Sequence, residues 1–351
     1  MSVEIKRKSF TIKVTEPEVY VDNKSRKRSG HMSHALAEWA PGKLIDFNSN
    51  CSAVKHEGHS TFGFIEYRLS EDAGETFSDI YTLPYSMQAL FDGINVISVE
   101  KAVACDDGRI VAICLRNDAD GVCEPWDTPM TVTSFDGGKT WTREKEICQY
   151  KGRIYDACYH EGVIYLLEFC NDAAVDFVGQ NEEHVYRLFT SRNNGDSFEE
   201  LCVVPLPNLG RAYGSMLFDD KGLLHVYAYN KNDETHMDHI TSRDCGKSWD
   251  TADTCYVKEG IRNPQTALID GVYILHGRNS AATGFVLYTS EDGITWDEGT
   301  YLGREERYCY YSNNIVLKDK NGKNRLLIQY SEMYGVKQCV NIIHRWLTVE
   351  N

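Results

Sequence analysis

An eight-residue pattern recurs five times along the chain of 351 residues. Its clearest copy, residues 134–141, reads Ser-Phe-Asp-Gly-Gly-Lys-Thr-Trp. The copies begin at Ser70, Ser134, Ser191, Ser242 and Ser290, so one occurs every 48 to 64 residues, and the fifth is one residue short. A repeat of this length indicates one small unit built several times. The spacing matches a four-stranded propeller blade with its loops.

The residue types of the repeat suit a tight turn. The aspartate can accept hydrogen bonds from backbone N–H groups of the turn. Glycine permits the positive φ that a tight turn needs. The Thr or Ser hydroxyl bonds locally, and the aromatic residue packs between strands. We therefore interpret every copy as a staple of a hairpin on the outside of a blade, and not as an active site.

Strand-like runs precede each copy of the repeat. A sixth set, at residues 310–317, 325–331 and 340–347, follows without a repeat and is one strand short of four. The N-terminal run Ser-Phe-Thr-Ile-Lys-Val at residues 9–14 could supply that strand. It would leave no sheet edge open. We predict an all-β, six-bladed β-propeller of four-stranded antiparallel blades, closed by the N-terminal strand and occupying residues 1–351 as one domain.

The repeat resembles the Asp-box, also called the BNR repeat, of sialidases. Five copies in phase span most of the chain. The resemblance implies membership of the sialidase-like superfamily of six-bladed propellers, and it implies a carbohydrate ligand.

Composition narrows the classes of partner. The formal net charge of −15 argues against nucleic acid, because nucleic-acid binders usually present a basic surface to phosphates. No apolar stretch is long enough to span a membrane. The 12 cysteines show no CxxC pair, so we expect free thiols in a cytoplasmic protein, or a secreted one if a signal peptide was trimmed. No metal-ligand spacing or nucleotide motif occurs, so we expect no metal and no cofactor.

In a propeller the inner strands converge on the central channel, and their first residues form one mouth. Arginine recurs at this position in three successive blades, as Arg153, Arg211 and Arg262. Converging guanidinium groups bind a carboxylate in bidentate fashion. The predicted substrate-binding residues are Arg28, Arg153, Arg211, Arg262, Arg278 and Gln265.

The sialidase resemblance implies a tyrosine nucleophile, which a Tyr-Ser pair at the start of the last blade would supply. Tyr311 and Ser312 match that pair, and Arg278, with Arg262 as a rival, matches the third arginine of the family. The predicted catalytic residues are Tyr311, Glu100, Asp156 and His31. Glu168 is an alternative to Glu100 as the group that takes the phenol proton.

Other family positions differ in this chain. Arg28 is the arginine nearest to the position of the family's first arginine. Asn230 stands at the position where the family has its second arginine. The first strand of blade four lacks the expected glutamate. Residues 51–60, where the family has its acid, contain His56, Glu57 and His59 but no aspartate.

Two classes of function remain open. The first is a sialidase-like glycoside hydrolase that acts on a terminal acidic sugar, with a near relative in a lyase on uronic-acid sugars that would use His31 or His34 with Tyr311. The second is a non-catalytic carbohydrate-binding propeller. Clustered arginine, tyrosine and carboxylate groups in the central pocket favour an enzyme, whereas a shallow aromatic rim favours a binder.

Overall fold

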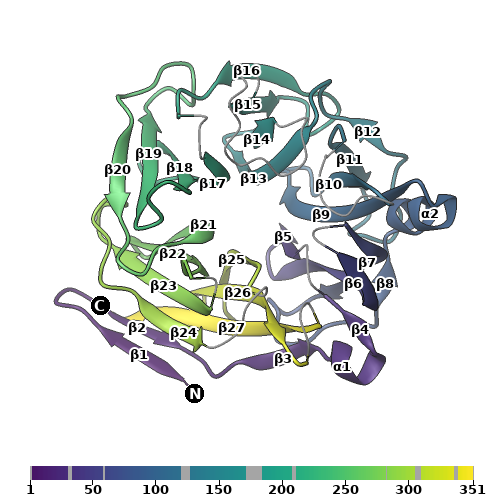
Figure 1. Cartoon of the computed structure of the whole chain (residues 1–351), viewed down its shortest axis with the longest axis horizontal. Coiled ribbons are helices and arrows are strands. Elements are labelled where there is room, and N and C mark those ends of the chain that lie inside the picture. Colours follow the sequence, from purple (N-terminus) through teal and green to yellow (C-terminus); the bar gives the residue numbers. More distant parts are fainter. Residues whose placement is uncertain are drawn as a thin grey trace.

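The strand-like runs between the repeats form six antiparallel sheets, which surround a central axis as the blades of a propeller (Figure 1). The computed structural model describes residues 2–30, 34–57, 60–119, 127–170, 184–207, 211–281, 283–304, 310–335 and 339–350, with the backbone alone at residues 34, 54–57, 60, 61 and 211. The predicted all-β, six-bladed architecture is confirmed.

The first five blades follow one another along the chain. Blade one contains β4 (Arg28–Ser29), β5 (His34–Ala40), β6 (Lys43–Glu57), β7 (Ser60–Ser70) and β8 (Tyr81–Thr82). Blade two contains β9 (Asn95–Ala104), β10 (Ile110–Asp118), β11 (Met130–Ser134) and β12 (Lys145–Glu146). Blade three contains β13 (Gly152–His160), β14 (Val163–Cys170), β15 (Tyr186–Ser191) and β16 (Glu199–Val203). Blade four contains β17 (Arg211–Phe218), β18 (Leu224–Asn230), β19 (His236–Ser242) and β20 (Asp253–Tyr256). Blade five contains β21 (Arg262–Ile269), β22 (Val272–Arg278), β23 (Gly284–Ser290) and β24 (Thr300–Arg304).

The sixth blade joins the two ends of the chain. Its strands β25 (Ser312–Lys318), β26 (Asn324–Met333) and β27 (Val340–Glu350) come from the C-terminal part. Strand β2 (Thr11–Val14) pairs with the last residues of β27, which confirms the predicted closure. Because β27 is 11 residues long, it also pairs with β3 (Glu18–Val21) near its start. Strand β1 (Val3–Lys6) adds a further strand outside β2.

The five repeats form the turns between the last two strands of blades one to five. In blade two, Asp136 Oδ1 accepts from the backbone N–H of Lys139 and Thr140 at 3.0 and 2.9 Å. The Ser134 hydroxyl accepts from the N–H of Gly138 at 2.8 Å, and Gly138 has a φ of 88°. The other four copies repeat the bond from the glycine N–H to the serine hydroxyl. The predicted staple is confirmed.

Two short helices were not predicted. Helix α1 (Asn23–Arg26) follows β3, and α2 (Pro84–Asp92) lies between β8 and β9. The signals for α2 were present, since Pro84 opens it and Gly93 caps it with a φ of 69°. Its residues Tyr85 and Ala89 pack on the apolar core shared by blades one and two.

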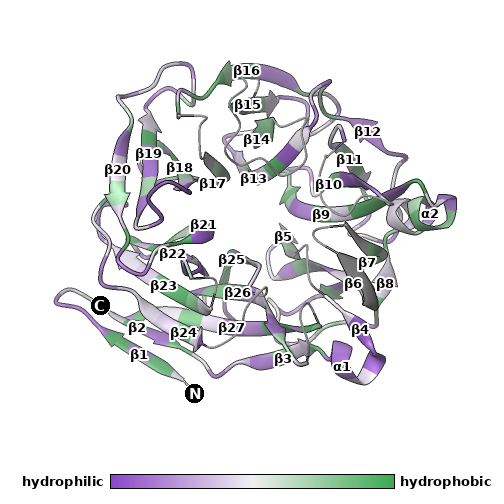
Figure 2. Cartoon of the chain, in the orientation of Figure 1, coloured by the Kyte–Doolittle hydropathy of each residue, from purple (hydrophilic) through white to green (hydrophobic). Residues whose placement is uncertain are grey.

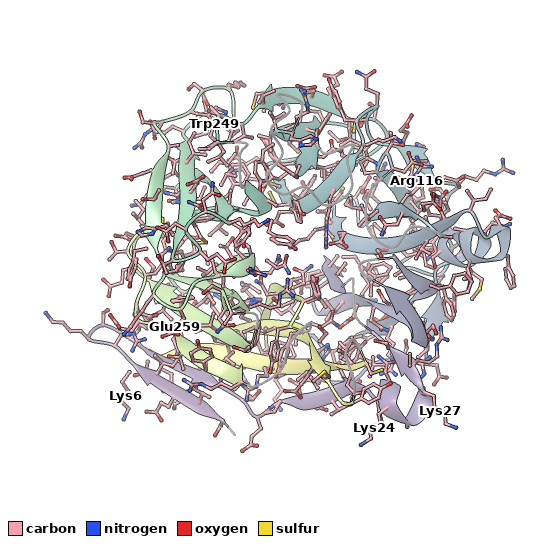
Figure 3. All side chains as sticks on the ribbon, in the orientation of Figure 1. Lys6, Lys24, Lys27, Arg116, Trp249 and Glu259 are labelled. Carbon is pink, nitrogen blue, oxygen red and sulfur yellow. The ribbon has the colours of Figure 1, made fainter. Side chains whose placement is uncertain are left out.

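The apolar core lies within and between the blades. The second strands supply completely buried residues such as Leu44, Val111, Ile164, Val226 and Ile274. Hydrophobic residues lie mainly within the blades, and the connecting loops are mostly hydrophilic (Figure 2). Side chains fill the space between the ribbons, while Lys6, Lys24 and Lys27 lie at the outer rim (Figure 3). The inner strands are therefore held on a rigid ring, which fixes the groups that face the axis.

Candidate functional site

The inner strands of blades two to five have an irregularity at the same level. The pairing with the second strand shifts past Glu100 in β9, Tyr155 in β13, Tyr213 in β17 and Asn263 with Pro264 in β21. A bulge turns a side chain out of the regular ladder. Glu100, Tyr155, Tyr213 and Asn263 all line one cavity at the start of the inner strands, which we call the mouth. The four bulges thus direct four side chains, one from each inner strand, toward the mouth.

Three residues of this region have left-handed backbone conformations. Tyr213, Asn263 and Tyr310 have φ values of 52°, 51° and 66°. Such conformations cost roughly 1 kcal/mol or more for residues other than glycine, and they cluster at functional sites because the surrounding structure must enforce them. Their position agrees with the placement of a site at the mouth.

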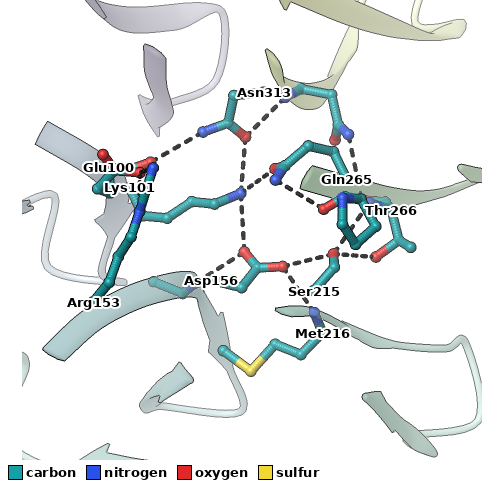
Figure 4. A network of polar contacts seen from close by, with 12 residues as sticks. Glu100, Lys101, Arg153, Asp156, Ser215, Met216, Gln265, Thr266 and Asn313 are labelled. Atoms are coloured by element: carbon teal, nitrogen blue, oxygen red, sulfur yellow. Dashed lines mark hydrogen bonds and ion pairs between the residues drawn. The ribbon is translucent and has the colours of Figure 1, made fainter. Parts of the chain in front are cut away.

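Lys101 forms the floor of the mouth (Figure 4). Its ammonium group donates to Gln265 Oε1 at 2.6 Å and to Asn313 Oδ1 at 2.9 Å, and it lies 3.0 Å from Asp156 Oδ1. Lysine has three N–H donors, and all three have partners here. Because these partners come from blades three, five and six, Lys101 ties four blades together across the channel.

Asp156 extends this network. Its Oδ2 accepts from the Ser215 hydroxyl at 2.9 Å and from the Met216 N–H at 2.8 Å, both in blade four (Figure 4). Asp156 and Gln265, which were predicted for catalysis and substrate binding, therefore lie in the floor with their oxygens engaged. Their predicted roles stay predictions, and the contacts show them holding Lys101.

Two of the predicted arginines have carboxylate partners. Arg153 is 4% exposed and donates from Nη2 to Glu100 Oε2 at 2.6 Å. Its pKa is raised further, because the attraction of Glu100 outweighs the burial that would lower it. Arg262 forms an ion pair with Glu234. Several arginines can pack closely only if a carboxylate neutralises the charge of each guanidinium.

Arg278 is different. It is 6% exposed, and its guanidinium lies over the ring of Tyr311, with the central carbon 4.6 Å from the ring centre. Among the residues that the structure describes, it makes no hydrogen bond or ion pair, and its Nε is buried. Arg262 lies directly opposite in the strand pairing and forms its ion pair with Glu234. Among the described residues, no carboxylate pairs with the Arg278 guanidinium beside Tyr311.

Tyr311 itself is 8% exposed and lines the mouth together with Glu100. Its backbone N–H donates to the Ser331 hydroxyl at 3.1 Å. The hydroxyl oxygen of the next residue, Ser312, lies 3.1 Å from Nδ1 of His276. The amide nitrogen Nδ2 of Asn314 lies 2.8 Å from Nε2 of the same ring. Burial lowers the pKa of His276 to about 3. The ring is therefore neutral at neutral pH, and it contacts the residue that follows Tyr311.

Not every predicted residue contributes to the mouth. Arg28, Arg262 and Arg278 are not among the residues that line it, and Arg28 donates to the backbone oxygen of Asn50 at 3.0 Å within blade one. Arg211 begins β17, but its side chain is not described, and His31 lies outside the described residues. Glu168, the alternative base, is completely buried in β14 and accepts from the Cys148 thiol. Lys101 and Asn313 complete the floor, and neither was in the predicted set.

Sequence comparison decides the family. The model of the BNR repeat-like domain family matches residues 2–254. The chain belongs to that family. No curated protein sequence matches this BNR-repeat chain.

Solved structures share the fold of the BNR-repeat chain at low identity. A protein of unknown function from Dyadobacter fermentans is 15% identical, with a TM-score of 0.71 and coverage of 97% of this chain and 99% of that one. Hadza microbial sialidase Hz136 is 12% identical, with a TM-score of 0.67 and coverage of 94% and 68%. The Trypanosoma rangeli sialidase with 2,3-difluorosialic acid is 12% identical, with a TM-score of 0.62 and coverage of 98% and 58%. At these identities, the three matches show that the chain shares its fold with these proteins.

Two further observations concern membrane-spanning helices and the cysteine thiols. No helix among the described residues of this BNR-repeat chain is long and apolar enough to cross a membrane. The ten cysteines that the structure describes are free thiols, as expected, and the other two, Cys123 and Cys309, lie outside the described residues.

Proposed function

We propose that this chain is a sialidase-like glycoside hydrolase that acts on a terminal sugar bearing a carboxylate. The observation that carries the proposal is the guanidinium of Arg278, which lies against Tyr311 and has no hydrogen-bond or ion-pair partner among the described residues. A buried charge without a counter-ion costs several kcal/mol. A substrate carboxylate at this position would supply the missing anion and two parallel hydrogen bonds.

Tyr311 is the proposed nucleophile. A neutral phenol approaches an anionic substrate without the repulsion that a carboxylate nucleophile would meet. Glu100 Oε2 is held by Arg153, whereas Glu100 Oε1 is buried with no hydrogen-bond partner among the described residues. As the phenol oxygen bonds to the anomeric carbon, its proton would pass to this free oxygen.

The bond to the leaving oxygen breaks in the same step, and that oxygen takes a proton from an acid. The family resemblance assigns the acid to residues 51–60, where His56, Glu57 and His59 are the candidates. Water would then release the sugar from Tyr311. The Trypanosoma rangeli neighbour with 2,3-difluorosialic acid, which is described as a covalent intermediate, supports this chemistry for the fold.

The test uses a panel of fluorogenic acidic and neutral glycosides. We expect turnover of an acidic glycoside by the unchanged protein. Tyr311→Phe should abolish turnover and keep binding, because the attacking oxygen alone is lost. Arg278→Ala should weaken binding and turnover together.

The matched control is Arg304→Ala in the outer strand β24. Arg304 also lies over a tyrosine ring, that of Tyr301 at 4.1 Å, but Arg304 is exposed, and Tyr301, unlike Tyr311, does not line the mouth. This variant should keep full activity. Binding of acidic sugars without turnover of any glycoside would instead identify a carbohydrate-binding propeller. Full activity of Tyr311→Phe would reject the tyrosine mechanism.

A further inference from the structure

A second cleft lies between blades four and five, at the opposite end of the strands from the mouth. It has a volume of about 490 Å³ and is lined by the turn between β17 and β18, by the nearby ends of β18 and β22, and by residues of two Asp-box turns. Three carboxylates (Asp219, Glu291 and Asp292) and two cations (Lys221 and Arg243) line it. The excess of carboxylates favours a cationic ligand.

His225 lies at the base of this cleft and is 2% exposed. Its Nδ1 is 3.0 Å from Nε2 of His239. Its Nε2 is buried and has no hydrogen-bond partner among the residues that the structure describes. Buried polar atoms are nearly always paired, so this nitrogen calls for a ligand.

The neighbours of His225 are compatible with a proton on its Nδ1. The Tyr227 hydroxyl donates to the carbonyl of Gly293 at 2.8 Å, so its oxygen offers a lone pair to Nδ1 of His225, 3.4 Å away. A proton on Nδ1 suits both this oxygen and His239. Nε2 then carries a bare lone pair.

Asp219 presents a second acceptor to the same space. Its Oδ1 accepts from the N–H groups of Lys221 and Leu223, both at 2.8 Å, which fixes the carboxylate in the turn. Its Oδ2 is 4.0 Å from His225 Nε2 and 3.4 Å from the Tyr273 hydroxyl. In this tautomer the lone pair of His225 Nε2 faces Asp219 Oδ2, which also accepts from the Tyr273 hydroxyl.

We propose that His225 Nε2 and Asp219 Oδ2 bind a divalent transition-metal ion of the zinc class. Imidazole nitrogen and carboxylate oxygen each bind Zn²⁺ at about 2.0–2.2 Å. The 4.0 Å between His225 Nε2 and Asp219 Oδ2 would therefore shorten by about half an ångström around a tetrahedral ion. His239 and the turn amides orient the two ligands from behind, as outer partners of metal ligands do. Among the described residues no three His, Cys, Asp or Glu side chains are grouped for a metal, so water from the open cleft completes the coordination.

The site is independent of the proposed hydrolase, since it lies at the other end of the strands. The test is a titration of the full chain with Co²⁺, followed by calorimetry and by the visible absorption of the bound ion. We expect one equivalent to bind through nitrogen and oxygen, with no thiolate-to-cobalt charge-transfer band.

Asp219→Asn is the decisive variant. It keeps Oδ1 for the turn but replaces Oδ2 with an amide N–H that can donate to His225 Nε2. We expect it to lose the equivalent of Co²⁺ and to melt at a higher temperature than the unchanged protein. His225→Gln should also lose the ion. A structural role alone would lower the melting temperature of Asp219→Asn.

Asp319→Asn is the matched control. Asp319 Oδ1 accepts from the N–H groups of Asn321 and Lys323 in the corresponding turn of blade six, but Arg325 stands where blade four has His225. This variant should bind Co²⁺ unchanged. Retention of the ion by Asp219→Asn, its loss from Asp319→Asn, a charge-transfer band from thiolate, or no binding to the unchanged protein would each overturn the proposal.

Discussion

The mouth and the Asp-box turns lie at opposite ends of the same strands, and they satisfy their polar groups differently. In the turns, each carboxylate or amide is exposed or half-buried and bonds within its own repeat. At the mouth, buried groups find partners across blades, as Lys101 does with Asp156, Gln265 and Asn313. A substitution in one turn therefore affects the hydrogen bonds of that turn alone. A substitution at the mouth removes contacts that join several blades.

The pKa values of carboxyl groups follow the same division. Hydrogen bonds from Thr140 lower the pKa of exposed Asp136 to about 2. Burial raises the pKa of Glu168 to about 7. One carboxyl group is stabilised as the anion by its own turn, and the other is held as the acid by the protein interior.

The largest effect should come from breaking the floor of the mouth. Lys101→Met leaves Asp156 as a buried carboxylate without its cation, which should lower the free energy of unfolding by about 3–5 kcal/mol. Chemical denaturation measures it. Lys101→Met combined with Asp156→Asn should recover part of the loss, because the uncompensated charge is gone. A single variant as stable as the unchanged protein would show that the floor is not a coupled network.

An intermediate effect should come from Glu168, with a defined dependence on pH. Its pKa is about 7 in the folded protein and about 4.3 when unfolded, so the folded state holds the extra proton between these values. The free energy of unfolding should therefore fall as the pH rises from about 4.3 to 7, and Glu168→Gln should remove up to about 3 kcal/mol of that fall. Denaturation at several pH values measures it, and parallel pH profiles for the two proteins would contradict the assignment.

The smallest effect should come from an Asp-box turn. Asp136→Ala removes four hydrogen bonds of one exposed turn and should lower the free energy of unfolding by about 1 kcal/mol. Ligand affinity at the mouth should not change. Asn193, which stands in place of the aspartate in blade three, offers a companion variant, Asn193→Ala. A large loss of sugar binding by a folded Asp136→Ala protein would contradict the division between the two ends.

Position along a strand was enough to place four of the predicted site residues. Glu100, Arg153, Gln265 and Tyr311 were expected at the mouth, and they line it. Lys101 was placed there but received no role, because its role depends on partners from three other blades. Glu234, which pairs with Arg262, lies in a loop whose path no periodic pattern describes.

The amino-acid sequence by itself determined the number of blades, the position of the Asp-box turns and the closing strand at residues 11–14. These features depend on local turn chemistry and on the alternation of strands, which repeat in every blade. Tertiary structure alone decided which cations are paired. Arg153, Arg262 and Arg278 look alike in the sequence, but Glu100 and Glu234 neutralise the first two, and Arg278 remains without a carboxylate partner among the described residues. The reason is that charge compensation depends on distances between blades, which only the closed ring establishes.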